Sequence, residues 1–240
     1  MSIPIDRDLG RARRRVRRWR MLGVLVAAGM LSGIVGAVPV LASTSITIRS
    51  GGCTGGGALF CYSPESAIVA TGAKVTWANQ SGAPHTATIC DTTNCPGAPA
   101  STGPEKFAVS INSTNGSTGA FTFTHAGAYY YYCQVHGYAN MHAKITVFAA
   151  PMLTSVKPSA VARGHTYSET LSGSHFTAGA TVHGPSGVTF SKVAVKSPST
   201  ITATMTISSA AATGTKKVLT VINPASAGSG RGSCACLTIN

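Results

Sequence analysis

Four side chains that can bind a soft metal ion lie in two short segments of the chain. His85 follows the turn-forming residues Gly-Ala-Pro, while Cys133, His136 and Met141 fall within nine consecutive residues. A thiolate, two imidazoles and a thioether together favour copper over Mg²⁺ or Ca²⁺. One loop between strands can supply three of these donors, and a neighbouring loop can supply His85. The sequence therefore predicts a copper site.

Other metal chemistries fit the sequence less well. The chain contains neither Cys-x-x-Cys nor His-Glu-x-x-His, the usual signatures of zinc fingers and metalloproteases. A single buried Cys or a single loop His is usually unremarkable, so the prediction depends on all four residues occurring together. The remaining histidines do not fit ligand positions and are expected at strand edges or on the solvated surface, with His142 as a possible contact of a ligand; they are His125, His142, His165, His175 and His183.

The composition favours a secreted, strand-rich protein. Charged residues make up 10% of the 240 residues, against about 25% in typical soluble domains. Alternation with a period of two recurs over residues 45–49, 73–77, 120–124 and 144–148, and the four tyrosines 129–132 form an aromatic strand leading into Cys133. The Gly/Ser/Thr/Pro-rich residues 96–119 are expected to form a long surface excursion. We predict an all-β fold.

A second block of short strands begins after Pro151. Its strands are expected around Val182 and over residues 188–195, 201–207 and 217–222. The predicted organisation is therefore a targeting segment at 1–42, a Greek-key β-sandwich at 43–149 and a smaller immunoglobulin-like β-sandwich at 150–240.

The N-terminal segment resembles an export signal. Residues 1–20 contain eight Arg, and residues 21–41 are mostly apolar. We expect cleavage after Ala42; the alternative is an uncleaved membrane anchor, since 21 residues can just span a bilayer. Either way, the rest of the chain is expected outside the cytoplasm, either secreted, periplasmic or on the cell surface, with possible membrane association.

Much of the basic charge belongs to this segment. The chain has 19 Lys and Arg against 6 Asp and Glu, and removal of residues 1–20 leaves 11 basic and 4 acidic residues, a charge of +7. The high net charge alone is therefore a weak argument for nucleic-acid binding, and no nucleic-acid partner is predicted.

Seven cysteines in an oxidising compartment indicate disulfides with at least one cysteine left over. Three local pairs can be drawn, namely Cys53 with Cys61, Cys90 with Cys95 and Cys234 with Cys236, and they leave Cys133 free. The third pair is open, because a Cys-x-Cys bridge is strained and either cysteine can instead bond elsewhere.

Two segments carry a resemblance to a known family. The sequence VTWANQSGAPHT beginning at Val75, and YCQVH beginning at Tyr132 with Met141 five residues beyond, resemble the ligand segments of the cupredoxins. These are the type 1 blue copper proteins, and the similarity is to the plastocyanin, pseudoazurin and halocyanin group. It covers residues 44–148, and the spacing from Cys133 to Met141 is that of the plastocyanin-type loop.

The resemblance implies a cupredoxin β-sandwich with one type 1 copper per chain. His85, Cys133 and His136 would form the trigonal ligand set, and Met141 would be the long axial ligand. It further implies that Asn79 ties the two ligand loops together.

The resemblance also implies contacts and partners around the site. The backbone N–H of Thr86 would point at the thiolate sulfur. Tyr132 stands where plastocyanins have an exposed Tyr considered as a second point of electron transfer, although packing alone would explain it. The implied function is a carrier of single electrons that meets a redox protein such as a cytochrome or an oxidase.

Catalysis is not expected at this site. Multicopper enzymes connect the type 1 site to a catalytic copper through histidines next to the ligand Cys, whereas Tyr132 and Gln134 flank Cys133 here. Two alternatives to electron transfer remain open: a copper storage or delivery protein using the same ligands, and a surface adhesion protein in which the cupredoxin domain is only a scaffold.

The block after Pro151 resembles the immunoglobulin-like IPT/TIG domains of surface proteins. The segments beginning at Leu153 (LTSVKP), Gly173 (GSHFTAGATV) and Val221 (VINP) carry this resemblance. It implies a structural or adhesive module without an active site of its own.

Overall fold

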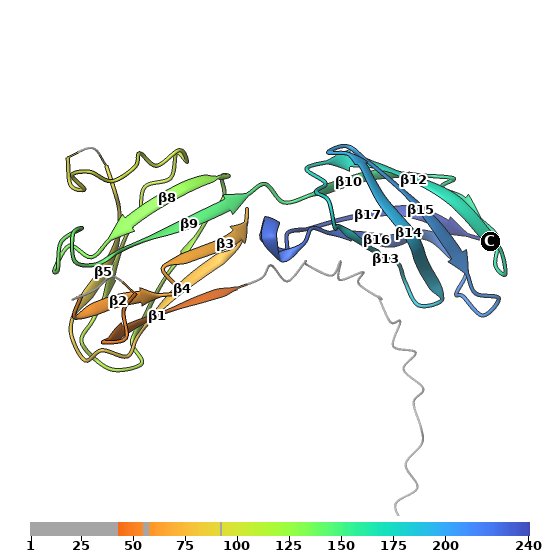
Figure 1. Cartoon of the computed structure of the whole chain (residues 1–240). Coiled ribbons are helices and arrows are strands. Elements are labelled where there is room, and N and C mark those ends of the chain that lie inside the picture. Colours follow the sequence, from red (N-terminus) through yellow and green to blue (C-terminus); the bar gives the residue numbers. More distant parts are fainter. Residues whose placement is uncertain (1–42, 55–57, 92) are drawn as a thin grey trace, which may run out of the picture. The chain divides into compact units, whose positions relative to one another are not determined.

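The computed structural model describes residues 43–54, 58–91 and 93–240, and these are nearly all β (Figure 1). Within this part of the chain the one helical element is the short 3₁₀ turn η1 (Ala225–Ala227). The prediction of an all-β fold is thus confirmed. The predicted targeting segment, residues 1–42, lies outside the described residues. No helix among the described residues is long and apolar enough to cross a membrane.

The first sandwich consists of a four-stranded and a five-stranded sheet. The strand order is β2-β1-β4-β7 in one and β3-β9-β8-β5-β6 in the other. The pairs β1–β4 and β3–β9 are parallel, and the other pairs are antiparallel. The bounds are β1 Thr44–Ser50, β2 Phe60–Ser63, β3 Ser66–Ala70, β4 Lys74–Asn79, β5 His85–Ile89, β6 Ala108–Ile111, β7 Thr118–Thr122, β8 Gly127–Tyr132 and β9 His142–Phe148.

The residues from Met152 onward form two further four-stranded sheets. Their orders are β10-β12-β15-β14 and β11-β17-β16-β13. The bounds are β10 Met152–Lys157, β11 Ala160–Val161, β12 Thr166–Ser174, β13 Thr181–His183, β14 Val188–Ser197, β15 Thr200–Ile207, β16 Gly214–Ile222 and β17 Arg231–Ile239. The two sheets enclose a separate apolar cluster that includes Leu171, Ile201 and Leu219. The specific resemblance to IPT/TIG domains stays a prediction.

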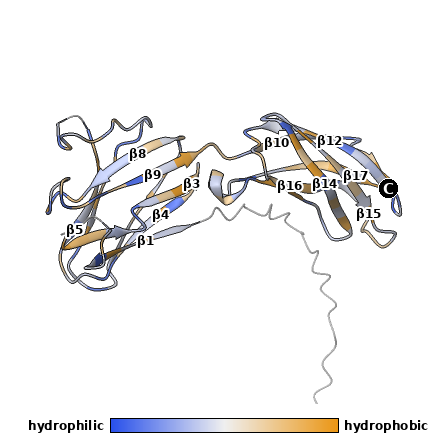
Figure 2. Ribbon diagram, in the orientation of Figure 1, coloured by the Kyte–Doolittle hydropathy of each residue, from blue (hydrophilic) through white to orange (hydrophobic). Residues whose placement is uncertain are grey.

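Hydrophobic and hydrophilic residues both occur along the strands of the first sandwich (Figure 2). Along β4, Val75, Trp77 and Asn79 are fully buried while the residues between them are less so. In β8, Tyr129 and Tyr131 are fully buried in this core. This is the two-residue period of a strand that packs one face on the core.

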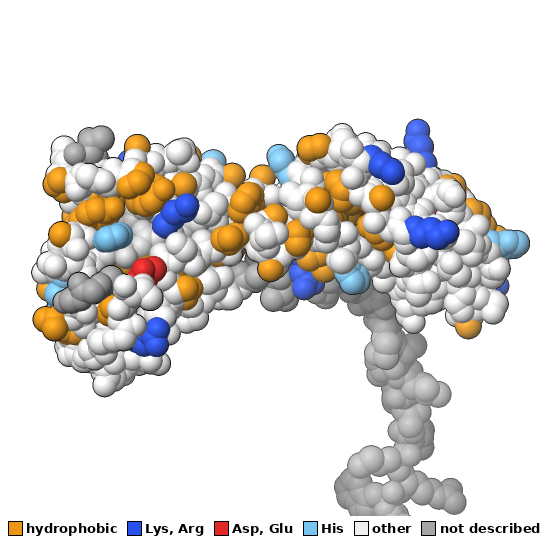
Figure 3. Space-filling model, in the orientation of Figure 1, with side chains coloured by type: hydrophobic (Ala, Val, Ile, Leu, Met, Phe, Trp, Pro, Cys, Tyr) orange, Lys and Arg blue, Asp and Glu red, His pale blue; other side chains and the backbone are white. Residues whose placement is uncertain are grey.

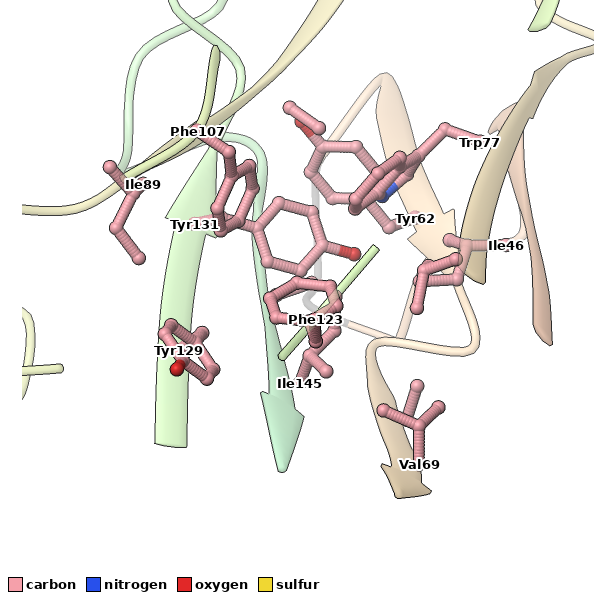
Figure 4. Packing of buried hydrophobic residues seen from close by; sticks show 14 of the residues in the cluster. Ile46, Tyr62, Val69, Trp77, Ile89, Phe107, Phe123, Tyr129, Tyr131 and Ile145 are labelled. Carbon is pink, nitrogen blue, oxygen red and sulfur yellow. The ribbon is translucent and has the colours of Figure 1, made fainter. Parts of the chain in front are cut away.

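Aromatic rings fill the centre of this core (Figure 4). The ring of Tyr131 lies 4.7 Å from that of Tyr62 and 5.6 Å from that of Trp77, measured between centroids. Phe107 stacks on Trp77 at 6.0 Å. Such contacts stabilise by about 0.5–1.5 kcal/mol each beyond simple area burial. The rigid core thus lies directly beneath the end of β8, where Cys133 begins the ligand loop.

The expectation of a long surface excursion over residues 96–119 is wrong in part. Phe107 and Ile111 are buried, at 5% and 2% exposure, and β6 pairs with β5. Two apolar side chains set among Ser, Thr and Gly are enough to draw this segment onto the sheet, because their burial outweighs the weak strand propensity around them.

The cysteines pair locally. Disulfides join Cys53 to Cys61, Cys90 to Cys95 and Cys234 to Cys236, so the pair that the sequence left open is also bonded. Cys133 is the free cysteine, and it is fully buried. The protein therefore keeps one thiol for other chemistry.

Candidate metal centre

The first predicted ligand, His85, is the first residue of β5. Its side chain is 2% exposed, and its Nδ1 lies 3.7 Å from Sγ of Cys133. The strand ladder fixes its backbone, because His85 pairs with Ile111 of β6. The ring thus enters the site from a rigid strand end.

The loop that carries the other predicted ligands starts at Cys133, directly after β8. Its backbone folds back on itself: the N–H of His136 and the N–H of Gly137 both donate to the Cys133 carbonyl, at 3.3 and 2.9 Å. The N–H of Cys133 donates to the Met141 carbonyl at 3.0 Å, and the N–H of Met141 to the Gly137 carbonyl at 3.1 Å. These backbone hydrogen bonds close a compact loop from Cys133 to Met141.

Three of the four predicted donors come together. The Nδ1 of His136 lies 3.3 Å from Sγ of Cys133, and the donor atoms of His85, Cys133 and His136 all lie within 4.8 Å of one another. Nitrogen and sulfur donors bound to one ion at about 2.0–2.3 Å stand about 3–4 Å apart. The donor set therefore fits a single ion, and its thiolate and imidazoles suit copper.

Met141 occupies the end of the same loop. It is 2% exposed and belongs to the hydrophobic cluster that contains Cys133. The fourth predicted ligand is thus buried in the same hydrophobic cluster as the thiol, and its backbone carbonyl accepts the N–H of Cys133.

The electrostatic setting keeps the two imidazoles neutral. Burial, and then the nearby His136, lower the pKa of His85 to about 4. Burial likewise lowers the pKa of His136. Because a metal binds the neutral imidazole, both rings are ready to act as ligands at neutral pH.

The thiol sulfur accepts a hydrogen bond from the backbone. The N–H of Thr86 points at Sγ of Cys133 across 3.3 Å, as the family resemblance implied. Hydrogen bonds of this kind stabilise the charged thiolate and tune a bound metal.

Phe60 also contacts the site and is not indicated by the sequence motifs. Its ring centroid lies 5.0 Å from that of His85 and 4.6 Å from that of His136, so one apolar ring covers both imidazoles. Next to it, Leu59, Phe60, His136 and Asn140 line a cavity of about 210 Å³. Leu59 and Phe60 directly precede Cys61, whose disulfide anchors this strand, but that order does not by itself indicate a contact with a histidine.

Asn79 plays a different part from the one expected. Its side-chain amide donates to the carbonyls of Ala83 and Asn112, at 2.7 and 2.6 Å, and accepts from Ser81. All its hydrogen-bonding capacity is used there, so it ties the His85 loop to the loop after β6 and does not reach the Cys133 loop.

Other polar candidates lie outside the site. His142 is exposed, and its Nδ1 contacts the Tyr138 carbonyl at 2.8 Å. Tyr132 is only 8% exposed and packs against the Cys90–Cys95 disulfide, in contrast to the exposed Tyr of the plastocyanins. Packing thus accounts for Tyr132.

Comparison with known proteins bears on the same part of the chain. Residues 51–148 match the family described as copper binding proteins, plastocyanin/azurin family. This range is less than half of the chain, and it contains all four predicted ligands. The match supports a cupredoxin domain in the first sandwich, and a cupredoxin domain implies copper binding.

Several solved structures are similar to a part of this chain. A novel purple cupredoxin from Nitrosopumilus maritimus is 27% identical, with a TM-score of 0.33, over 43% of this chain and 98% of its own. A native pseudoazurin from Hyphomicrobium denitrificans is 16% identical, with a TM-score of 0.32, over 44% and 75%. A reduced amicyanin variant is 23% identical, with a TM-score of 0.29, over 44% and 81%. No curated protein matches the chain.

Proposed function

We propose that the first sandwich holds one type 1 copper ion and carries single electrons between redox proteins. The observation that carries the proposal is the convergence of His85, Cys133 and His136, whose donor atoms lie within 4.8 Å of one another. Cys133 is also the cysteine left unpaired in a chain whose other six form disulfides. When bound, the copper ion supplies a one-electron couple between Cu(I) and Cu(II).

The protein's own contribution is rigidity. His85 is fixed at a strand end, and backbone hydrogen bonds close the loop from Cys133 to Met141. Donors held in this way move little when the charge of the site changes, and a small reorganisation favours fast electron transfer. The same rigidity supports a carrier over a storage protein, which must release its metal.

The exposure of the ligands supports an exchange of electrons at one face. His136 is half-buried, whereas His85 and Cys133 are almost completely covered. The exposed apolar side chains Leu59 and Val135, at 76% and 56%, belong to the two segments that meet at His136. A partner can approach the His136 ring there without desolvating ions.

We further propose a protein partner outside the cytoplasm. Three disulfides are typical of an oxidising compartment. On the face seen in Figure 3, Lys and Arg side chains stand apart from one another. Eight of the 19 Lys and Arg residues lie in residues 1–20, which favours a redox protein over a nucleic acid as the partner of the first sandwich. A carrier role over catalysis is supported by Tyr132 and Gln134 beside Cys133, where coupling to a catalytic copper would need histidine.

An absorption spectrum tests the proposal. Copper(II) added to the purified protein should produce an intense blue colour from thiolate-to-metal charge transfer, lost in Cys133→Ser, and ascorbate should bleach it reversibly. A protein that binds Cu(II) without colour would contradict type 1 ligation. Coloured protein that exchanges electrons slowly with small redox proteins would favour storage or delivery, and no uptake of copper would favour a scaffold.

A further inference from the structure

The hydroxyl of Ser81 stands between the buried amide of Asn79 and the first imidazole of the metal centre. Its Oγ lies 2.8 Å from Oδ1 of Asn79 and 2.7 Å from Nε2 of His85. The N–H of Ala83 also points at this oxygen, at 3.2 Å. Gly82, with a φ of +77°, allows the tight turn that brings the N–H of Ala83 back to Ser81.

The contacts of Asn79 fix the orientation of its amide. Nδ2 faces two carbonyl oxygens, those of Ala83 and Asn112, so both of its protons are donated. Oδ1 faces the backbone N–H of Ser81 at 2.9 Å. The reverse orientation would set an oxygen against two carbonyls and an NH₂ group against an N–H, which loses every one of these bonds.

The orientation of Asn79 fixes the hydroxyl of Ser81 in turn. Oδ1 of Asn79 has no proton, so the contact at 2.8 Å requires Ser81 to donate its one proton there. The Ser81 oxygen then has only acceptor capacity left, and the N–H of Ala83 uses one lone pair. The other lone pair faces Nε2 of His85, which must therefore carry a proton.

A protonated Nε2 leaves Nδ1 of the neutral ring with a free lone pair. Nδ1 is the atom that lies 3.7 Å from Sγ of Cys133, on the metal side of the ring. The other tautomer would place an N–H on Nδ1, where it could donate to the sulfur and block the position that a metal needs. Asn79 is fully buried and His85 is 2% exposed, whereas Ser81 itself is half-buried, so these bonds are shielded from water on the Asn79 and His85 sides.

We propose that Ser81 is a positioning residue that sets the tautomer of His85 and so presents Nδ1 to the metal before the metal arrives. The proposal rests on the proposed function for the identity of the metal, but the tautomer itself is a property of the metal-free protein. It adds to the site a serine that the ligand motif alone does not indicate.

Nitrogen-15 NMR of the metal-free protein at neutral pH tests the proposal directly. Long-range proton–nitrogen correlations distinguish the two ring nitrogens of His85. In the wild type we expect Nε2 to be protonated and Nδ1 to be bare. Ser81→Ala should give a mixture of tautomers with a substantial Nδ1–H fraction, and Ser81→Thr, which keeps the hydroxyl, should restore the wild-type pattern.

A copper competition assay gives the second readout. Ser81→Ala should bind copper about 10- to 100-fold more weakly than the wild type, and Ser81→Thr should lie close to the wild type. An Nδ1–H tautomer in the wild type, or an unchanged pure Nε2–H tautomer in Ser81→Ala, would overturn the proposal. If Ser81→Ala does not fold, the wild-type tautomer alone still decides. The NMR measurement uses no copper. A protein that fails to bind copper would therefore overturn the proposed function, while the tautomer of His85 could still be determined.

Discussion

Thr86 contacts the Cys133 segment with two different groups. Its backbone N–H donates to Sγ of Cys133 at 3.3 Å, and its Oγ1 accepts from the N–H of Gln134 at 2.9 Å. The carbonyl of Thr86 in turn accepts a hydrogen bond from the hydroxyl of Tyr62, which belongs to the aromatic core. One residue of β5 thus joins the buried aromatic core to both sides of the thiol.

The two contacts of Thr86 can be separated by mutation. Thr86→Val removes the oxygen that serves Gln134 but keeps the backbone donor to Cys133. We expect a loss of about 0.5–1.5 kcal/mol in the free energy of unfolding, measured in urea on the metal-free protein, and an unchanged blue absorption with copper. Thr86→Ser keeps the hydroxyl and should match the wild type. Loss of the blue absorption in Thr86→Val but not in Thr86→Ser would mean that the copper–thiolate bond depends on the side chain of Thr86 and not on its backbone N–H.

Met141 can be tested as the axial ligand by a change of donor atom. Met141→Gln replaces a soft sulfur with a harder oxygen, which favours Cu(II) and lowers the reduction potential. We expect the reduction potential to fall by at least about 59 mV. For a one-electron couple this corresponds to a tenfold stronger preference for Cu(II) over Cu(I). Cyclic voltammetry measures it. A potential equal to that of the wild type would remove Met141 from the ligand set.

Phe60 should act as a cover over the two imidazoles. Phe60→Ala enlarges the cavity beside His136 and admits water or small anions to the metal side, whereas Phe60→Leu keeps most of the apolar bulk. Azide added to the copper-loaded protein should therefore change the spectrum of Phe60→Ala much more than that of Phe60→Leu or the wild type. Equal responses in all three would show that Phe60 does not limit access.

The apolar surface next to His136 should control electron exchange with protein partners. Leu59→Glu places a charge there and should slow electron transfer to a physiological redox partner at least tenfold, with the spectrum unchanged. Val218→Glu, a change of equal charge at a half-exposed site in the second sandwich, should have little effect. Stopped-flow kinetics compares them, and equal rates for both variants would exclude this surface as the docking site.

Glu169 should make the stability of the second sandwich depend on pH. Neither carboxyl oxygen has a hydrogen-bond partner, and burial raises the pKa of Glu169 from 4.5 to about 7. The folded state therefore holds a proton that the unfolded state releases as pH rises above about 4.5. The contribution of this group to stability is full below that pH, falls as pH rises towards 7 and then levels off.

A substitution isolates this effect. Glu169→Gln removes the ionisation, so its advantage over the wild type in urea unfolding should be small at pH 5 and reach about 1–3 kcal/mol at pH 8. The exposed substitution Glu65→Gln serves as the control and should not alter the pH profile of the second sandwich. A constant difference between Glu169→Gln and the wild type at both pH values would contradict the prediction.

The alternation of residue types along the sequence was enough to predict the strands around Trp77 and Tyr131, because residues on the buried face of a strand recur at every second position. The spacing of Cys133, His136 and Met141 was likewise informative, since one loop carries all three. Phe60 and Ser81 were not predictable in the same way. Each contacts His85 through the three-dimensional folding of a separate segment, and neither a Phe before a cysteine nor a Ser in a turn is unusual on its own.

In the second sandwich, too, some elements could not be predicted from local sequence patterns. Strands β10, β11, β12 and β17 were not predicted. Ser, Thr and Gly make up most of β12, and β11 is only two residues long, so neither shows a clear alternation in the sequence. Glu169 is a clear case: no sequence rule would place a carboxylate in the middle of an apolar face, and only the pairing of β12 with β15 puts it there.

The three short disulfides have a consequence for how the protein must be assembled. Each of the six paired cysteines finds its partner within eight residues, and short loops close with the smallest entropic cost. Cys133 is far along the chain from every other cysteine, so random collisions during oxidation rarely engage it. The spacing of the cysteines thus favours pairing within each local segment and disfavours a disulfide to Cys133.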